Sequence, residues 1–264
     1  MAVQVEIHAF IGGYIRTVKE RLIQTTDERE MGRPHWIPIP FYVVRHGSSL
    51  VAFDTGMNER CARDPEGHLG KDILAVPIVP EMKPEEAFDK QLKSRLGIEP
   101  RDLNGLILSH GHLDHAGSVH VFADTEVPIF VQRSELQVIE EGQIGYMPAD
   151  YGDLKRLHFV PVDGVLDVFG DGTVVAFPMP GHTPGMMSLM VTVTDGRRYV
   201  LTSDALDSIE QLEKRILPWV AWDESKVVQV FNVLSLLRLA GAEIVPEHDP
   251  FYWKNRPLAP HPFE

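Results

Sequence analysis

The stretch His110-Gly111-His112-Leu113-Asp114-His115 decides how this chain is interpreted. It places four side chains that commonly bind metals within six positions, directly after the apolar run 105–109. In an extended or turning segment, His110 and His112 share one side and can reach a single ion. Asp114 and His115 then point toward a second ion. Imidazole mixed with carboxylate is a borderline ligand set that zinc often fills. The stretch therefore predicts a metal site.

Three further candidate ligands lie where other predicted strands end. His182 lies in the turn PGHTPG (180–185), beyond the predicted strand 173–177, and the prolines and glycines of this turn would hold it rigidly. Asp204 and His248 follow the predicted strands 198–202 and 242–245. Taken singly, each residue is more often structural. As a set at strand ends, where functional sites are usually assembled, they favour a site built from several loops.

Short strands and helices alternate along the rest of the chain. Residues 41–44 and 50–53 are predicted to form a hairpin. A helix is expected from about residue 84 to Leu96, ending at Gly97, and another is expected to be capped by Ser134 and to run to Glu141. Residues 58–80 lack clean periodicity and are interpreted as a surface excursion. The other expected elements are strands at 3–10, 105–109, 127–131, 157–162, 173–177, 186–193, 198–202 and 242–245, and a helix at 224–240.

Composition sets the broad class. The chain has 264 residues, of which 44% are hydrophobic and 24% charged, as is ordinary for a globular protein. The net charge of −13 disfavours a nucleic-acid partner, because binding to phosphates depends on Lys and Arg. The single cysteine, Cys61, permits neither an internal disulfide nor a thiolate-rich zinc site. We predict one α/β domain over residues 1–264, and leave a homodimer open.

The chain shows no signal for export or membrane insertion. Its first residues, MAVQVEIHAFIGG, have no basic segment followed by an apolar one, and no apolar run is long enough to span a bilayer. We therefore expect a cytoplasmic protein without a membrane partner, although a chain trimmed of its leader would look the same.

With Asp54-Thr55-Gly56, which follows an early predicted strand, these motifs resemble the metallo-β-lactamase superfamily in order and spacing. The resemblance covers nearly the whole chain and implies an αββα sandwich with metals at one edge. Class B β-lactamases use a cysteine ligand where this chain has none between His182 and Asp204. The chain is more similar to the N-acyl-homoserine-lactone lactonases and their small-lactone relatives.

The resemblance implies a role for each candidate residue, with two divalent ions bound, zinc being favoured. Asp54 would support the site without binding metal. The first ion would be held by His110, His112 and His182, and the second by Asp114, His115 and His248, with Asp204 bridging the two. A bridging water activated by both ions would attack the carbonyl of a small-molecule lactone.

One position departs from the lactonase pattern. Those enzymes commonly carry a tyrosine three residues after the bridging aspartate, and here that position is Asp207. A carboxylate donates no hydrogen bond unless it is protonated. We consider Asp114 the candidate proton shuttle and place Asp207 near the leaving group. A solvated Asp207 that caps a helix before Ile209 explains the residue equally well.

Other functions of the superfamily stay open. The alternatives are a hydrolase of another ester, a thioester or an organophosphate, and a member that uses iron for redox chemistry. Metal content would distinguish the iron-dependent member from the hydrolases. Trp219 and Trp222 could wall an apolar substrate pocket, but an aromatic pair is more often plain core.

Overall fold

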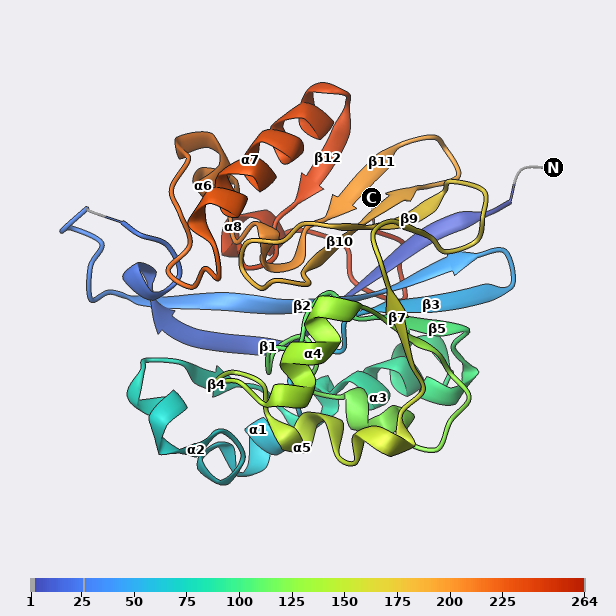
Figure 1. Cartoon of the computed structure of the whole chain (residues 1–264), viewed down its shortest axis with the longest axis horizontal. Coiled ribbons are helices and arrows are strands. Elements are labelled where there is room, and N and C mark those ends of the chain that lie inside the picture. Colours follow the sequence, from blue (N-terminus) through green and yellow to red (C-terminus); the bar gives the residue numbers. More distant parts are fainter. Residues whose placement is uncertain (1–2, 26, 264) are drawn as a thin grey trace.

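The computed structural model describes residues 3–25 and 27–263, and these form two β-sheets packed face to face between helices (Figure 1). The first sheet has seven strands in the order β4-β1-β2-β3-β5-β6-β7, and the second has five in the order β12-β11-β10-β9-β8. The first contains β1 Val5–Val18, β2 Pro34–His46, β3 Ser49–Phe53, β4 Val79–Glu81, β5 Gly105–Ile107, β6 Ile129–Gln132 and β7 Phe159–Val162. The second contains β8 Leu166–Asp167, β9 Val174–Pro178, β10 Met187–Thr192, β11 Arg198–Leu201 and β12 Ala242–Val245.

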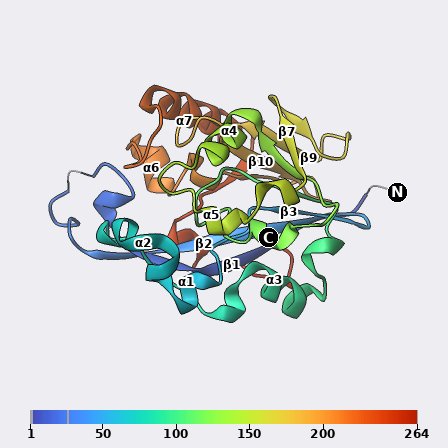
Figure 2. The ribbon, with the colours of Figure 1, turned by 60° about the horizontal axis from the view of Figure 1, so that its bottom comes forward.

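Helices cover the outer faces of both sheets. The helices α3, α4 and α5 lie on the first sheet, and α6 and α7 lie on the second (Figures 1 and 2). Together with the two sheets they make the expected αββα sandwich. The helices are α1 Arg60–Arg63, α2 Pro65–Ala75, α3 Phe88–Gln91, α4 Arg133–Glu141, α5 Pro148–Tyr151, α6 Ile209–Lys214, α7 Glu224–Leu239 and α8 Pro250–Trp253. None of the described helices is both long and apolar enough to cross a lipid bilayer.

Alternation along the strands explains why the first sheet lies between two apolar layers. In β2, Phe41 and Val43 pack against the helices on the outer face, whereas Tyr42 and Val44 pack between the sheets. Successive side chains of a strand point to opposite faces, so a strand buried on both sides is apolar at consecutive positions. The predicted hairpin is confirmed: β2 and β3 are antiparallel, with His46 opposite Ser49.

Strand ends bring the predicted ligands to one edge of the sandwich. In the first sheet β3 and β5 are parallel, so Asp54 and the segment that starts at His110 leave the sheet side by side. In the second sheet β11 and β12 are parallel, and Asp204 and His248 follow them. Loops at strand ends therefore bring these residues to one edge, as expected.

Several local predictions were wrong. Residues 58–80 are not an irregular excursion but contain α1, α2 and β4; the side chain of Asp64 accepts the N–H of Gly67 and caps α2. The first strand runs on to Val18 because its adjacent glycines, Gly12 and Gly13, form an irregularity in the pairing with β2 rather than a stop.

The predicted helix boundaries also need correction. The helix expected at 84–96 is broken at Ala87, whose backbone is extended, although it ends at Gly97 as predicted. Ser134 does not cap α4, which begins at Arg133 with Gln132 in the capping position. The hydroxyl of Ser134 donates instead to the carbonyl of Pro184. The long helix α7 matches its prediction to within one residue.

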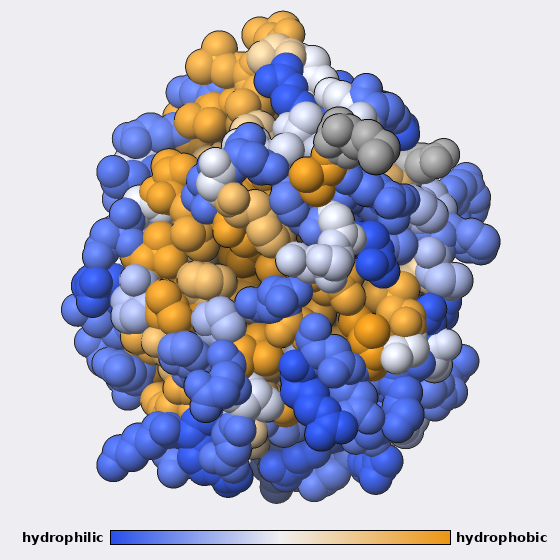
Figure 3. Space-filling model, turned by 90° about the vertical axis from the view of Figure 1, so that its right-hand side faces the viewer, coloured by the Kyte–Doolittle hydropathy of each residue, from blue (hydrophilic) through white to orange (hydrophobic). Residues whose placement is uncertain are grey.

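The surface on the right-hand side of Figure 1 is mixed in character. Apolar residues reach the surface there within a hydrophilic margin (Figure 3). Exposed apolar area of this kind is common in folded proteins. A surface of this kind does not identify a dimer interface, so the homodimer stays a prediction.

Candidate metal centre

The histidine stretch leaves the sheet after β5 and turns tightly. The backbone N–H groups of His115 and Ala116 both donate to the carbonyl of His112 at 3.0 and 2.8 Å. His110 and His115 are fully buried. This turn lets the side chains of four residues in a row of six approach one centre.

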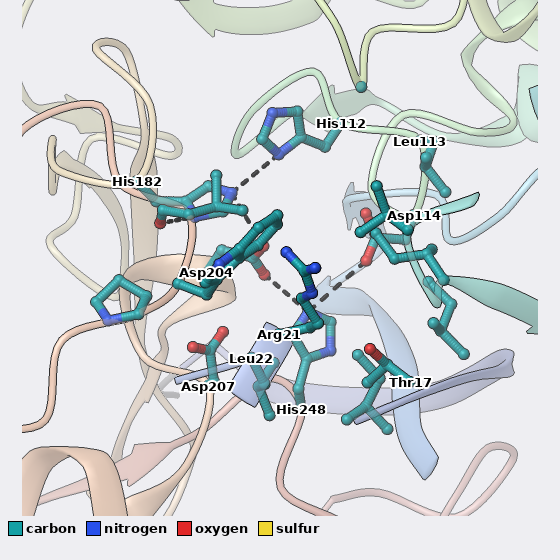
Figure 4. A pocket seen from close by; sticks show the side chains of 18 of the residues that line it. Thr17, Arg21, Leu22, His112, Leu113, Asp114, His182, Asp204, Asp207 and His248 are labelled. Atoms are coloured by element: carbon teal, nitrogen blue, oxygen red, sulfur yellow. Dashed lines mark hydrogen bonds and ion pairs between the residues drawn. The ribbon is translucent and has the colours of Figure 1, made fainter. Parts of the chain in front are cut away.

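Four ligand atoms gather in a first group. His112 Nδ1 lies 3.1 Å from His110 Nε2 and 2.9 Å from His182 Nε2, and His182 Nε2 lies 3.2 Å from Asp204 Oδ2 (Figure 4). All four atoms lie within 4.8 Å of one another. Three imidazole nitrogens and a carboxylate oxygen around one small volume make a set that suits a divalent transition metal.

A second group lies beside the first, and Asp204 reaches both. Asp204 Oδ1 is 3.0 Å from Nε2 of His115 and 3.0 Å from Nε2 of His248. Asp114 Oδ2 lies 3.8 and 3.7 Å from the same two nitrogens. The structure therefore brings together all seven residues predicted as ligands, with Asp204 between the two groups.

Hydrogen-bonding groups on the side away from the centre orient most of the imidazole rings. Four of the five imidazoles turn Nε2 toward the centre while Nδ1 lies within hydrogen-bonding distance of another group; His112 alone presents Nδ1. Such contacts hold a ring's orientation and its tautomer. The Nδ1 partners are Ser109 Oγ for His110, Asp54 Oδ2 for His115, the Val220 carbonyl for His182 and the Pro38 carbonyl for His248, at 3.0–3.1 Å.

Unsatisfied atoms and shifted pKa values both indicate that the centre fits metal ions. Nε2 of His115 and Oδ1 of Asp204 are buried and have no hydrogen-bond partner of suitable geometry among the described residues. Burial lowers the pKa of His182 to about 4, so its imidazole is neutral and able to bind a metal at neutral pH. Burial opposes protonation of His248, but Asp204 and Asp114 outweigh it and raise its pKa to about 10. Carboxylates gathered in this way favour a cation among them.

Asp54 supports the centre as the resemblance implies. It is buried and has a positive φ of 60°, which turns the chain sharply after β3. Its carboxylate accepts the backbone N–H and the hydroxyl of Ser109, both at 2.7 Å, and lies 3.0 Å from Nδ1 of His115. The same carboxylate therefore positions the start of the histidine stretch and one of its rings.

A second buried carboxylate, that of Glu135 in α4, was not predicted from the sequence. Its Oε1 accepts the N–H of Gly111 at 3.0 Å and the hydroxyl of Tyr146 at 2.7 Å. Its Oε2 accepts the N–H of Gly185 at 3.0 Å and the hydroxyl of Thr183 at 2.7 Å. Glu135 thus ties the histidine stretch to the turn that carries His182.

The close approach of α4 explains one glycine of that turn. A Cβ atom on Gly185 would lie 2.3 Å from the backbone nitrogen of Glu135. The spacing of Glu135, Val138 and Ile139 places the glutamate on the apolar face of α4, and this is the signal that could have revealed it.

Glu247 is another buried acid that the sequence did not single out. Neither of its carboxyl oxygens accepts a hydrogen bond from a described residue, and Oε1 lies 4.0 Å from Nδ1 of His115. Burial raises the pKa of its carboxyl group well above the usual range.

A pocket opens onto the two groups. Its volume is about 270 Å³, and its lining includes the candidate ligands His112, Asp114 and His248 (Figure 4). Trp219 lines it and is 39% exposed, so it belongs to the pocket rather than the core. Trp222 is 56% exposed and does not line it. The aliphatic part of the wall consists of Ile15, Leu22, Ile37, Ile73, Val76, Ile78, Leu113, Ile144 and Val220.

Asp207 also lines this pocket, but it does not cap a helix. Ser208 caps α6, and Asp207 is only 4% exposed. Its carboxylate Oδ2 accepts from Nε2 of Gln211 at 3.1 Å, and its backbone N–H donates to Oε1 of the same side chain at 2.9 Å. Burial and then the charge of Asp204 raise the pKa of Asp207 to about 7. The capping alternative was therefore wrong.

Known proteins with this arrangement identify the family. The family model described as the metallo-β-lactamase superfamily matches residues 36–248, from β2 to the last predicted ligand. The chain belongs to the metallo-β-lactamase superfamily. Its place in the superfamily is the acyl-homoserine-lactone lactonase branch.

Relatives and a solved structure define that branch. The chain is 31% identical to the N-acyl homoserine lactonase AttM of Azorhizobium caulinodans over 87% of its own length and 88% of the relative's. It is 32% identical to the N-acyl homoserine lactonase AiiA of Bacillus thuringiensis subsp. kurstaki over 71% of each. An N-acyl homoserine lactone hydrolase solved with the product N-hexanoyl-L-homoserine at its catalytic metal centre superimposes with a TM-score of 0.87 at 25% identity, covering 99% of this chain and 100% of the other. The protein is thus a metal-dependent hydrolase related to these lactonases.

Proposed function

We propose that this metallo-β-lactamase family member opens the ring of N-acyl homoserine lactones or closely similar lactones, with two divalent ions held at the centre and zinc favoured. His110, His112 and His182 would hold the first ion, and Asp204 would lie between the two. The second ion would be held by Asp114, His115 and His248.

One observation carries the proposal: side chains from both groups of candidate ligands line a largely aliphatic pocket. The ligands could act on a carbonyl group, and the pocket leading away from them has the apolar character that suits an acyl chain. The related N-acyl homoserine lactonases support this substrate class.

Bound divalent ions would supply an activated hydroxide and stabilise the negative charge that develops on the attacked carbonyl oxygen. The chain's own residues would set the geometry. Asp114 lines the pocket as well as the second group, so it is placed to take the proton of the attacking water and pass it to the leaving alkoxide. The water oxygen would form a bond to the carbonyl carbon, the ring C–O bond would break, and the alkoxide would receive the proton from Asp114, which gives the open hydroxy acid.

The aliphatic wall would orient the substrate. An acyl chain lying along Ile73, Val76 and Ile78 would place the lactone ring at the inner end of the pocket. Burial of such a chain is favourable by about 0.8 kcal/mol for each methylene removed from water. Short and long acyl chains should therefore differ in KM more than in kcat.

The test combines metal analysis with a substrate panel. The purified protein should contain two divalent ions per chain and should hydrolyse N-hexanoyl homoserine lactone, while thioesters and phosphotriesters react slowly. Asp204→Asn should reduce kcat/KM by about 10³-fold, equal to about 4 kcal/mol of transition-state stabilisation. The matched control is Asp195→Asn, which changes an exposed carboxylate paired with Arg197 and should leave activity unchanged.

Two results would contradict the proposal. Activity confined to phosphotriesters or thioesters would overturn the lactone assignment. A single iron with no second metal would exclude the two-metal hydrolytic centre and favour the redox branch of the superfamily.

A further inference from the structure

Asp207 differs from the other acids of the pocket in how it is held. Gln211 of α6 is only 1% exposed and makes two hydrogen bonds to Asp207. The amide nitrogen of Gln211 donates to Oδ2 of Asp207, and its amide oxygen accepts the backbone N–H of Asp207. No described residue donates a hydrogen bond to Oδ1. The backbone N–H of His248 donates to the carbonyl of Asp207 at 3.0 Å, which links Asp207 directly to a candidate ligand. The carboxylate is therefore fixed, buried and left with one oxygen free.

The carboxylate of Asp207 lies beside the candidate metal centre. Asp204, Asp207 and His248 carry ligand atoms that all lie within 4.8 Å of one another. Among the ion pairs of the described residues, His248 pairs with Asp204 and Asp114 but not with Asp207, so Asp207 lies close to His248 without being paired to it. Figure 4 shows the carboxylate of Asp207 on the same side of the pocket as Asp204 and His248.

We propose that Asp207 is a further ligand of the second metal position, so that this position holds three carboxylates and two imidazoles. The inference rests on the proposed two-metal function and deepens it. The hydrogen bond from Gln211 would orient the carboxylate, as groups around metal ligands commonly do. A buried carboxylate beside two others is costly without a cation among them, and a metal ion supplies that cation.

The extra carboxylate makes the two positions unequal. The first has three imidazoles and the shared Asp204, a set that suits zinc. The second becomes rich in oxygen ligands, which suit harder divalent ions such as Mn²⁺. Under this proposal the carboxylates of the second position would be Asp114, Asp204 and Asp207, and its imidazoles would be His115 and His248. Asp114, His115 and His248 form one group of close ligand atoms and Asp204, Asp207 and His248 form another, with His248 common to both.

The experiment measures metal binding rather than turnover. Protein stripped with a chelator is loaded with one equivalent of Zn²⁺ and then titrated with Mn²⁺, with free Mn²⁺ followed by electron paramagnetic resonance. Asp207→Asn keeps the size of the side chain but removes its charge. It should weaken Mn²⁺ binding by about tenfold or more, while the affinity for the first Zn²⁺ stays within about twofold.

Glu210→Gln is the matched control. This residue lies on α6, loses the same charge, and pairs with Lys19 and Lys214 rather than with the pocket. It should bind Mn²⁺ as the wild type does. If Asp207→Asn fails to fold, Asp207→Glu replaces it; moving the carboxylate by one methylene should alter both the Mn²⁺ affinity and the spectrum of the bound ion.

The outcomes separate this inference from the proposed function. A wild-type protein that binds two ions, together with an Asp207→Asn variant of unchanged Mn²⁺ affinity, would overturn the ligand role alone and return Asp207 to the leaving group. An unchanged affinity and spectrum in Asp207→Glu would have the same meaning. A wild type that binds fewer than two ions would instead count against the proposed two-metal hydrolase.

Discussion

The metal centre and the aliphatic wall of the same pocket are built in opposite ways. The centre consists of largely buried side chains in loops at strand ends. Hydrogen bonds orient four of its imidazoles, as Asp54 does for His115, and Glu135 holds the backbone of the histidine stretch at Gly111. The wall is drawn from segments far apart in the sequence, including β1, α2 and the stretch around Trp219, and part of it is exposed. We infer from this difference that the centre determines the class of reaction, whereas the wall determines which substrates bind.

The largest effect is expected when the support of the metal centre is weakened without changing a candidate ligand. Glu135→Gln keeps the shape of a side chain that accepts four hydrogen bonds, but its amide nitrogen cannot accept, so buried donors around it lose their partner. We expect the free energy of unfolding to fall by about 3 kcal/mol. Metal affinity should fall by about 10–100-fold, because both ligand-bearing loops lose a common support.

Thermal unfolding of the metal-free protein and calorimetric metal titration measure the two effects. Glu140→Gln is the control, since this residue of α4 is exposed and should change stability by less than about 0.5 kcal/mol. Equal stability and equal metal affinity in the two variants would show that the hydrogen bonds of Glu135 are not needed to position the candidate ligands.

The wall gives the next largest effect. Trp219→Ala removes an aromatic side of the pocket on which the guanidinium of Arg21 stacks, 4.5 Å from the ring centre. We expect KM for N-decanoyl homoserine lactone to rise roughly tenfold, equal to about 1.4 kcal/mol, with kcat and metal content unchanged. N-butanoyl homoserine lactone should be affected much less, because its acyl chain covers less of the wall.

Steady-state kinetics on the two lactones test this, and Trp222→Ala serves as the control because Trp222 does not line the pocket. A loss of kcat that is equal for both substrates would mean that Trp219 acts on the metal centre. The separation between centre and wall would then fail.

The same contrast explains what could be predicted from sequence. The candidate ligands could be predicted because metal binding requires particular residue types and strand ends place them at one edge. The seven residues converge as expected, although their role as ligands stays a prediction. Glu135 was missed because a glutamate in a helix is usually solvated, and only its three-dimensional partners show otherwise. Trp219 was considered for the wall, but the aliphatic residues of the wall were missed because any aliphatic residue can serve there. Residues 58–80 illustrate this: α2 contributes Ile73 to the pocket, yet the segment has no clear periodicity.

The smallest expected effect on activity lies behind the wall, at Cys61. This residue packs with Ile15, Ile37 and Leu113, which line the pocket on their other side. Burial, followed by the charges of Asp150 and Asp114, raises the pKa of its thiol to about 12. At pH 8 the native thiol should therefore react with Ellman's reagent at least about 10³-fold more slowly than the unfolded chain, since only the thiolate reacts.

The raised pKa of Cys61 also fixes the sign of a stability change. The folded chain keeps the thiol proton where the unfolded chain, with a pKa of about 8.5, loses it. The contribution is fully present below about pH 8.5, and stability is lost as pH rises toward 12, by about 1.4 kcal/mol for each pH unit. Denaturant unfolding of wild type and Cys61→Ala at pH 8 and pH 10 isolates this slope, because the variant lacks the thiol. Lactonase activity of Cys61→Ala should stay within about twofold, since a lost sulfur atom leaves a small gap on the far side of the wall. A rapid reaction of the native thiol would instead show that the segment carrying α1 and α2 opens readily, and the wall would then be a mobile part of the pocket.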